Sequence, residues 1–100
     1  MPKVTVTIPH QHQPQEAIDR IQPAIKHVLE AFNASNVEMT WTDQIANFKC
    51  SSMGFPITGV ANVAPELVTV DVTLPFAAAM FKGNVEKSLT KHLTKALQIQ

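Results

Sequence analysis

The chain has 100 residues, of which 45% are hydrophobic and 16% are charged, and its eight basic residues balance its eight acidic ones. This length predicts a single domain over residues 1–100. The neutral balance argues against a general nucleic-acid binder, which usually carries a basic excess. The sequence contains no run of about 20 apolar residues, so we expect no transmembrane segment.

Cys50 is the only cysteine of the chain, so an internal disulfide cannot form. The N-terminal residues alternate in polarity and lack the apolar stretch of a secretory signal. Both features predict a reducing, cytoplasmic setting. A domain of this size buries only somewhat over 60% of its unfolded surface, so a homodimer or a bound partner would add stability.

The first third of the chain predicts a strand and then a helix. Residues 3–8 alternate apolar and polar side chains, which is typical of a strand with one buried face, and Pro9 ends it. Pro14 suits the first turn of a helix. The apolar residues that follow recur at helical spacing and are Ile18, Ile21, Ile25, Val28, Leu29 and Phe32. Pro23 lies within this stripe and lacks a backbone donor, so we expect a kink or two abutting helices.

The next forty residues predict an antiparallel meander of four strands. Alternation of apolar and polar residues places these strands at 37–42, 46–51, 57–63 and 68–74. Short polar or glycine-containing segments separate them. Gly59 lies inside the third of these strands, which predicts a bulge or a close approach of another group to the backbone.

The C-terminal part predicts an apolar connector and a second helix. Pro75 ends the last strand, and the run from Leu74 to Phe81 is the longest apolar stretch of the chain. Gly83 and Asn84 are expected to act as breaker and N-cap of the helix. One face of this helix is apolar, with Val85, Leu89, Leu93, Ala96 and Leu97. The opposite face carries Lys87, Lys91 and Lys95.

Together these elements predict an α+β fold in which an antiparallel sheet of about five strands is packed by two helices, in the order β-α-β-β-β-β-α. The shared periodicity of five segments also predicts which side chains form the core. These are Val4, Val6, Ile8, Ile21, Ile25, Val28, Phe48, Val68, Val70, Val72, Leu89 and Leu93.

Several motifs along the chain resemble the polyhydroxyalkanoic acid system protein family, also called the polyhydroxyalkanoate granule region family. They are the start Met1 to Val6 followed by Pro9-His10, Trp41 with Asp43, Gly54 with Gly59, and Leu74 with the helix from Val85 to Leu93. The resemblance spans nearly the whole chain, and none of the motifs is catalytic. It implies a non-enzymatic accessory protein associated with polyester granules, with a curved sheet gripping the last helix as in a reduced helix-grip fold.

The residues themselves point to no catalytic or cofactor site. His10 and His12 are one residue apart and could share a metal ion, but spacing places no third ligand beside them, so a polar loop that caps the helix is favoured and no metal site is predicted. Cys50 lies mid-strand and is expected to be a buried structural thiol. The carboxylates are scattered, and three glycines cannot form a phosphate-binding loop. We therefore expect no enzymatic activity and no cofactor.

The distribution of charge is uneven along the chain. Residues 1–81 hold four basic and seven acidic residues, a net charge of −3, whereas residues 82–100 hold four basic and one acidic residue, a net charge of +3. Lys82 adds to the three lysines of the last helix. The positive helix would attract an anionic surface or an acidic partner; the simpler interpretation is a solvated helix face.

The apolar run 74–81 is the strongest candidate for binding. Phe76, Met80 and Phe81 could cover the core of the domain, form a dimer patch, or contact a hydrophobic polymer or acyl chain. Trp41, on a strand face, is a further candidate contact, although such a residue is more often part of the core. We expect a non-catalytic accessory protein that binds a partner through an apolar surface. The alternative is a small carrier that holds a hydrophobic ligand in a cavity between the sheet and the last helix.

Overall fold

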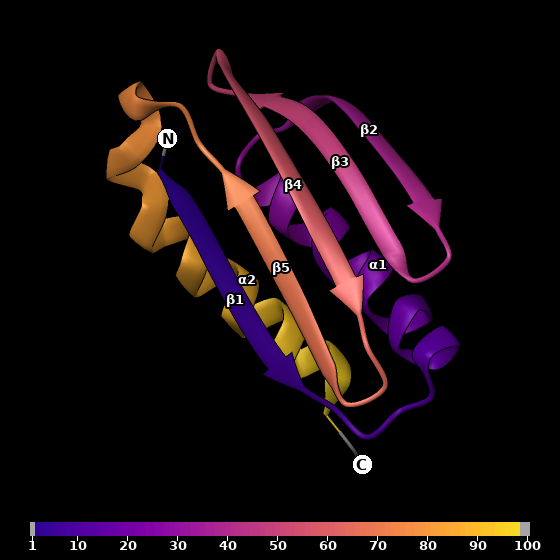
Figure 1. The fold of residues 1–100 in the computed structure, drawn as a ribbon. Coiled ribbons are helices and arrows are strands. Elements are labelled where there is room, and N and C mark those ends of the chain that lie inside the picture. Colours follow the sequence, from indigo (N-terminus) through magenta and orange to yellow (C-terminus); the bar gives the residue numbers. More distant parts are fainter. Residues whose placement is uncertain (1, 99–100) are drawn as a thin grey trace.

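The computed structural model describes residues 2–98 and confirms the predicted α+β fold and element order. Figure 1 shows one antiparallel sheet with both α-helices behind it. The elements are β1 (Lys3–Pro9), α1 (Pro14–Ala31), β2 (Ser35–Thr42), β3 (Ile45–Ser52), β4 (Phe55–Val63), β5 (Leu67–Thr73), the 3₁₀-helix η1 (Phe76–Phe81) and α2 (Lys82–Leu97).

The sheet has the strand order β1-β5-β4-β3-β2, so the N-terminal strand pairs with the last strand and lies at one edge. Its register aligns Val4, Val6 and Ile8 of β1 with Val72, Val70 and Val68 of β5. These side chains all point to the face that the helices cover, because alternate residues of a strand share a face. The opposite face is open to solvent and mainly polar, with Thr5 hydrogen-bonded to Asp71 across the strands at 2.6 Å.

The buried face of the sheet and the two helices form one hydrophobic core. Helix α2 packs against β1 and against α1, and η1 packs against α2. The side chains of His27 on α1 and His92 on α2 stack between the helices with their ring centroids 6.2 Å apart. All twelve residues that the periodicity assigned to the core are buried.

Helix α1 remains one helix in spite of Pro23, so the prediction of two abutting helices is wrong. Pro23 is exposed, although the nearby residues Ile21 and Ala24 in the sequence are buried, so its ring lies on the solvent side of the helix. The backbone donor that proline lacks would have paired with the carbonyl of Asp19, which is also on an exposed residue. Water can solvate that carbonyl, and burial of the apolar stripe keeps the two halves of the helix together.

The start of α2 differs from the prediction. We expected Gly83 to break the chain and Asn84 to cap the helix, but the helix begins at Lys82 and Gly83 lies in its first turn. Helix η1 runs directly into α2, and the backbone N–H of Lys82 donates to the carbonyl of Ala79. The preceding 3₁₀ turn therefore satisfies a donor that a capping side chain would otherwise bind.

Gly59 permits a close approach between two strands. It is paired with Phe48 across β3 and β4 without a register shift, so the alternative of a bulge is wrong. The Phe48 ring lies directly over the Gly59 Cα, and a Cβ atom at residue 59 would overlap the ring. Phe48 is therefore buried in the core through the absence of a side chain on its neighbour.

We predict that Leu89→Ala lowers the free energy of unfolding by about 2–5 kcal/mol, as truncation of a buried leucine does. Leu89 is 3% exposed on the face of α2 that contacts the sheet and α1. Urea denaturation measures the effect, with the exposed Lys91→Ala as the matched control that should change stability by less than about 0.5 kcal/mol. An unchanged midpoint for Leu89→Ala would contradict the placement of α2.

We also predict opposite effects of Gly→Ala at two positions. Gly59→Ala should destabilise the fold by about 1–3 kcal/mol, because the new methyl group displaces the Phe48 ring. Gly83→Ala should stabilise it by about 0.5–1 kcal/mol, because Gly83 is helical and nothing lies within 4 Å of the added Cβ. Thermal unfolding of the two variants measures both effects, and equal shifts would contradict the packing of Phe48 over Gly59.

Candidate functional site: an apolar end of the molecule

The apolar run 74–81 both covers the core and exposes large side chains. Residues three apart share a face of a 3₁₀-helix, and in η1 Ala78 and Phe81 point inward, where Ala78 is buried and Phe81 packs against the core half-buried. Phe76 and Met80 belong to the other rows and are 75% and 78% exposed. Of the three candidate contact residues on this segment, two therefore point to solvent, and Phe81 does so only in part.

The tight turn between β3 and β4 adds a third exposed apolar side chain. Ser52 pairs with Phe55, so Met53 and Gly54 form a two-residue hairpin loop, and both have positive φ angles, +52° and +82°. Two positive φ angles are typical of a type I′ turn, for which Asn-Gly is the preferred sequence. Met53 is 56% exposed. Its left-handed backbone conformation is unfavourable for residues other than glycine, asparagine and aspartate.

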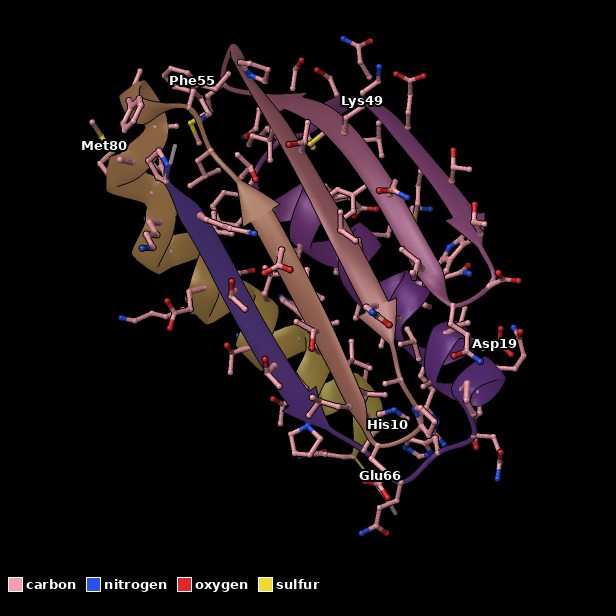
Figure 2. All side chains as sticks on the ribbon, in the orientation of Figure 1. His10, Asp19, Lys49, Phe55, Glu66 and Met80 are labelled. Atoms are coloured by element: carbon pink, nitrogen blue, oxygen red, sulfur yellow. The ribbon has the colours of Figure 1, made fainter. Side chains whose placement is uncertain are left out.

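Helix η1 and the β3–β4 turn lie at the same end of the molecule. Figure 1 shows both at the end of the sheet where β1 begins, and Figure 2 shows the labelled side chains of Phe55 and Met80 at this end. We call the surface formed by Met53, Phe55, Phe76, Met80 and Phe81 the apolar end. Met53 and Phe55 were not among the residues predicted from the sequence; the available signal is a methionine where a type I′ turn favours asparagine.

A small cavity opens at the apolar end and extends between the helices and the sheet. Its volume is about 60 Å³. Its lining includes the buried Ile25 and Val28 of α1 and Val72 of β5, together with the half-buried Phe55 and Phe81, which are partly open to solvent. Almost every lining side chain is apolar, so the cavity suits an apolar group.

Among the described residues, the lining of this cavity includes one thiol, that of Cys50, and one hydroxyl group, that of Ser52. The Ser52 hydroxyl donates a hydrogen bond to the carbonyl of Phe32, and so it is already paired. Burial raises the pKa of the Cys50 thiol, because it disfavours the charged thiolate. The expected buried structural thiol is thus found at residue 50, with one side toward the cavity.

His10 and His12 lie at the opposite end, where their ring nitrogens hold the N-terminal loop to other segments. His10 is buried, accepts the backbone N–H of His12 at its Nδ1, and its Nε2 therefore donates to the carbonyl of Ala64 at 2.7 Å. His12 bonds the carbonyl of Leu97 through Nε2 at 3.0 Å and lies 3.5 Å from Glu16. Within residues 2–98 no group of three metal-ligating side chains gathers there.

The remaining candidates do not join the apolar end. Trp41 is half-buried against the core near the β2–β3 turn. Successive turns of an antiparallel meander alternate between the two ends of a sheet, so this turn lies away from the β3–β4 turn (Figure 1). The four lysines of residues 82–95 are exposed along α2, and none takes part in an ion pair among the described residues.

Comparison with known proteins supports the fold and identifies the family. The chain is similar to TTHA0849 from Thermus thermophilus, a protein of known crystal structure, with a TM-score of 0.60 and 14% sequence identity over 96% of this chain and 97% of that one. At this identity the likeness concerns the fold alone. No curated protein matches the chain at a significant level. None of the helices described over residues 2–98 is long and apolar enough to cross a membrane.

The family comparison covers most of the sequence. A family model described as "Putative polyhydroxyalkanoic acid system protein" matches residues 4–97, which include every strand and helix apart from the first residue of β1. The resemblance seen in the motifs is thereby confirmed. The chain belongs to the polyhydroxyalkanoic acid system protein family.

Proposed function

We propose that this protein is a non-catalytic accessory protein of a polyhydroxyalkanoate system, which works in the cytoplasm and associates with the polyester granule through its apolar end. The observation that carries the proposal is the exposure of Phe76 and Met80, at 75% and 78%, beside a hairpin tip that exposes Met53. Family membership supplies the context in which a hydrophobic polyester is the partner.

The exposed side chains of η1 are not required to close the core. Ala78 and Phe81 already cover this end of the sheet, because they occupy the inward row of the 3₁₀-helix. Phe76 and Met80 leave large apolar areas in water, and burial of such area on a partner is favourable by about 25 cal/mol per Å². A hydrophobic surface would recover this free energy, whereas the isolated domain does not.

The backbone of the hairpin tip supports the same proposal. Met53 adopts a left-handed conformation that costs an ordinary residue roughly 1–2 kcal/mol. Strain at an exposed apolar residue favours a functional explanation over a stabilising one. Methionine is also a residue whose flexible thioether adapts to irregular apolar surfaces.

The size of the cavity distinguishes the proposal from the alternative of a hydrophobic-ligand carrier. Pockets that enclose a small molecule usually measure about 300–1,000 Å³. The cavity behind the apolar end measures about 60 Å³. This volume does not enclose a whole ligand, so the structure favours surface association over carriage.

We predict that Phe76→Ser combined with Met80→Ser weakens association with poly(3-hydroxyalkanoate) particles by about tenfold or more, since two large apolar contacts are lost. Co-sedimentation with the particles measures the effect, and analytical sedimentation of the protein alone reports whether a second copy is the partner instead. The double variant should keep its thermal stability, because both side chains are exposed.

The matched control replaces two exposed apolar residues elsewhere. Ile45 and Val60 lie on the open face of the sheet and are 40% and 38% exposed. Ile45→Thr with Val60→Thr should leave particle association unchanged and keep the β-branched shape that strands favour. Equal losses in the two double variants would mean nonspecific adsorption and would overturn the proposal, as would full association of a folded Phe76→Ser, Met80→Ser variant.

A second prediction separates stability from association. Met53→Asn should raise the free energy of unfolding by about 0.5–1 kcal/mol, because asparagine tolerates the left-handed conformation of this turn. The same change should weaken particle association, because it removes an apolar side chain from the apolar end. Urea denaturation and co-sedimentation measure the two quantities, and an association that is unchanged would remove the hairpin from the site.

A further inference from the structure

We propose that the cavity of the apolar end takes the tip of one unbranched alkyl chain that carries an anionic head group. This inference rests on the proposed function for its setting and names the chemistry that the same site recognises. The apolar end would then capture a single chain end in addition to lying on a hydrophobic surface.

The lining of the cavity selects for apolar groups. The Ser52 hydroxyl already donates its hydrogen to the carbonyl of Phe32, and the thiol of Cys50 is a weak hydrogen-bond donor. A polar group that enters the cavity would exchange its bonds to water for at most the lone pairs of the Ser52 hydroxyl and the weak thiol, and each bond left unmade costs about 1–3 kcal/mol. The occupant is therefore a hydrocarbon.

The volume of the cavity selects for a narrow hydrocarbon. The cavity is small, with a volume of about 60 Å³. An apolar cavity known to hold benzene measures about 150 Å³, so an aromatic ring is too large. The last carbons of a straight chain have the required width, and the methylene groups that follow would lie between the side chains of Phe55 and Phe81, which are partly open to solvent.

The charge of the adjacent helix selects for an anionic head group. Lys82 is exposed and directly follows Phe81, whose ring lines the cavity. Helix α2 carries four lysines and one glutamate over residues 82–97, a net charge of +3. A carboxylate at the free end of the chain would meet the ammonium group of Lys82 first, because the other three lysines lie further along α2.

The lone cysteine provides a direct test with decanoate, used below its micelle concentration. Because Cys50 lines the cavity, a bound chain should slow the reaction of its thiol with a thiol-specific reagent, by about tenfold at ten times the dissociation constant. Decan-1-ol should protect less than decanoate because it lacks the charge that meets Lys82, benzoate should not protect, and equal protection by decan-1-ol would overturn the anionic head group. A rate that decanoate does not change would overturn the inference.

A cavity-filling variant tests where the chain binds. Ala34 is half-buried and lines the cavity, so Ala34→Leu should fill it and abolish protection by decanoate. Ala31→Leu, on an exposed neighbour outside the cavity, is the matched control and should retain protection. In the unmodified protein, decanoate should shift the methyl resonances of Ile25 and Val72 and leave those of Val6 and Ile8 in place. The opposite pattern would overturn the inference even if Ala34→Leu fails to fold.

The two proposals fail separately. Phe76 and Met80 do not line the cavity, so Phe76→Ser with Met80→Ser should lose particle association and keep decanoate protection. Ala34→Leu should show the reverse. If Ala34→Leu and Ala31→Leu are protected equally, the chain end does not enter the cavity, and the association of the apolar end with polyester stands or falls on its own experiment.

Discussion

The structure depends on one requirement, which is that the apolar face of the sheet be covered along its whole length. Helices α1 and α2 cover most of it, and η1 covers the end near the β3–β4 turn through Ala78 and Phe81, apart from the opening of the small cavity. A 3₁₀-helix can turn only one of its three rows of side chains inward. Closing the core with an almost entirely apolar segment therefore pushes Phe76 and Met80 into solvent, and the candidate site follows from that geometry.

The two exposed surfaces of the molecule differ in chemistry for reasons that the fold makes plain. The open face of the sheet carries threonine, asparagine and charged side chains on alternate positions, with local pairs such as Lys49–Glu38 at 3.3 Å and Thr5–Asp71 at 2.6 Å. These groups satisfy one another or water. The apolar end, as far as the described residues form it, has no such pairing, and its hairpin tip holds Met53 in a conformation that stability alone would not favour. This contrast makes the apolar end the surface where a partner fits best.

The periodicity of the sequence predicted most of the fold. Strong alternation in residues 3–8 and 68–74 and a clear helical stripe in residues 18–32 reflect burial of one face, which the structure confirms. The predicted start of α2 was wrong. Local propensity favours Gly83 as a helix breaker, but the preceding 3₁₀ turn provides the Ala79 carbonyl as acceptor for the backbone N–H of Lys82, the first residue of α2. The continuity of α1 through Pro23 likewise depends on which side of the helix faces water.

The candidate site was predictable only in part. The composition of residues 74–81 indicated either a binding role or a core-covering role. The segment has both, because the three-residue period of a 3₁₀-helix turns Ala78 inward and leaves Phe76 and Met80 exposed. Met53 and Phe55 lie well before this segment in the sequence, and only the strand pairing of β3 and β4 brings them to the same end. The cavity is a property of packing between α1, the sheet and η1, for which no sequence pattern exists.

We propose that this member of the polyhydroxyalkanoic acid system protein family contacts a polyester granule with its apolar end. Hydrogen–deuterium exchange with and without poly(3-hydroxyalkanoate) particles tests it most directly, because it reports the contact region without any substitution. The account predicts new protection of backbone amides in residues 53–55 and 76–81, and none on the open face of the sheet in residues 58–62. Protection that spreads over the open face, or that is absent from η1, would contradict it.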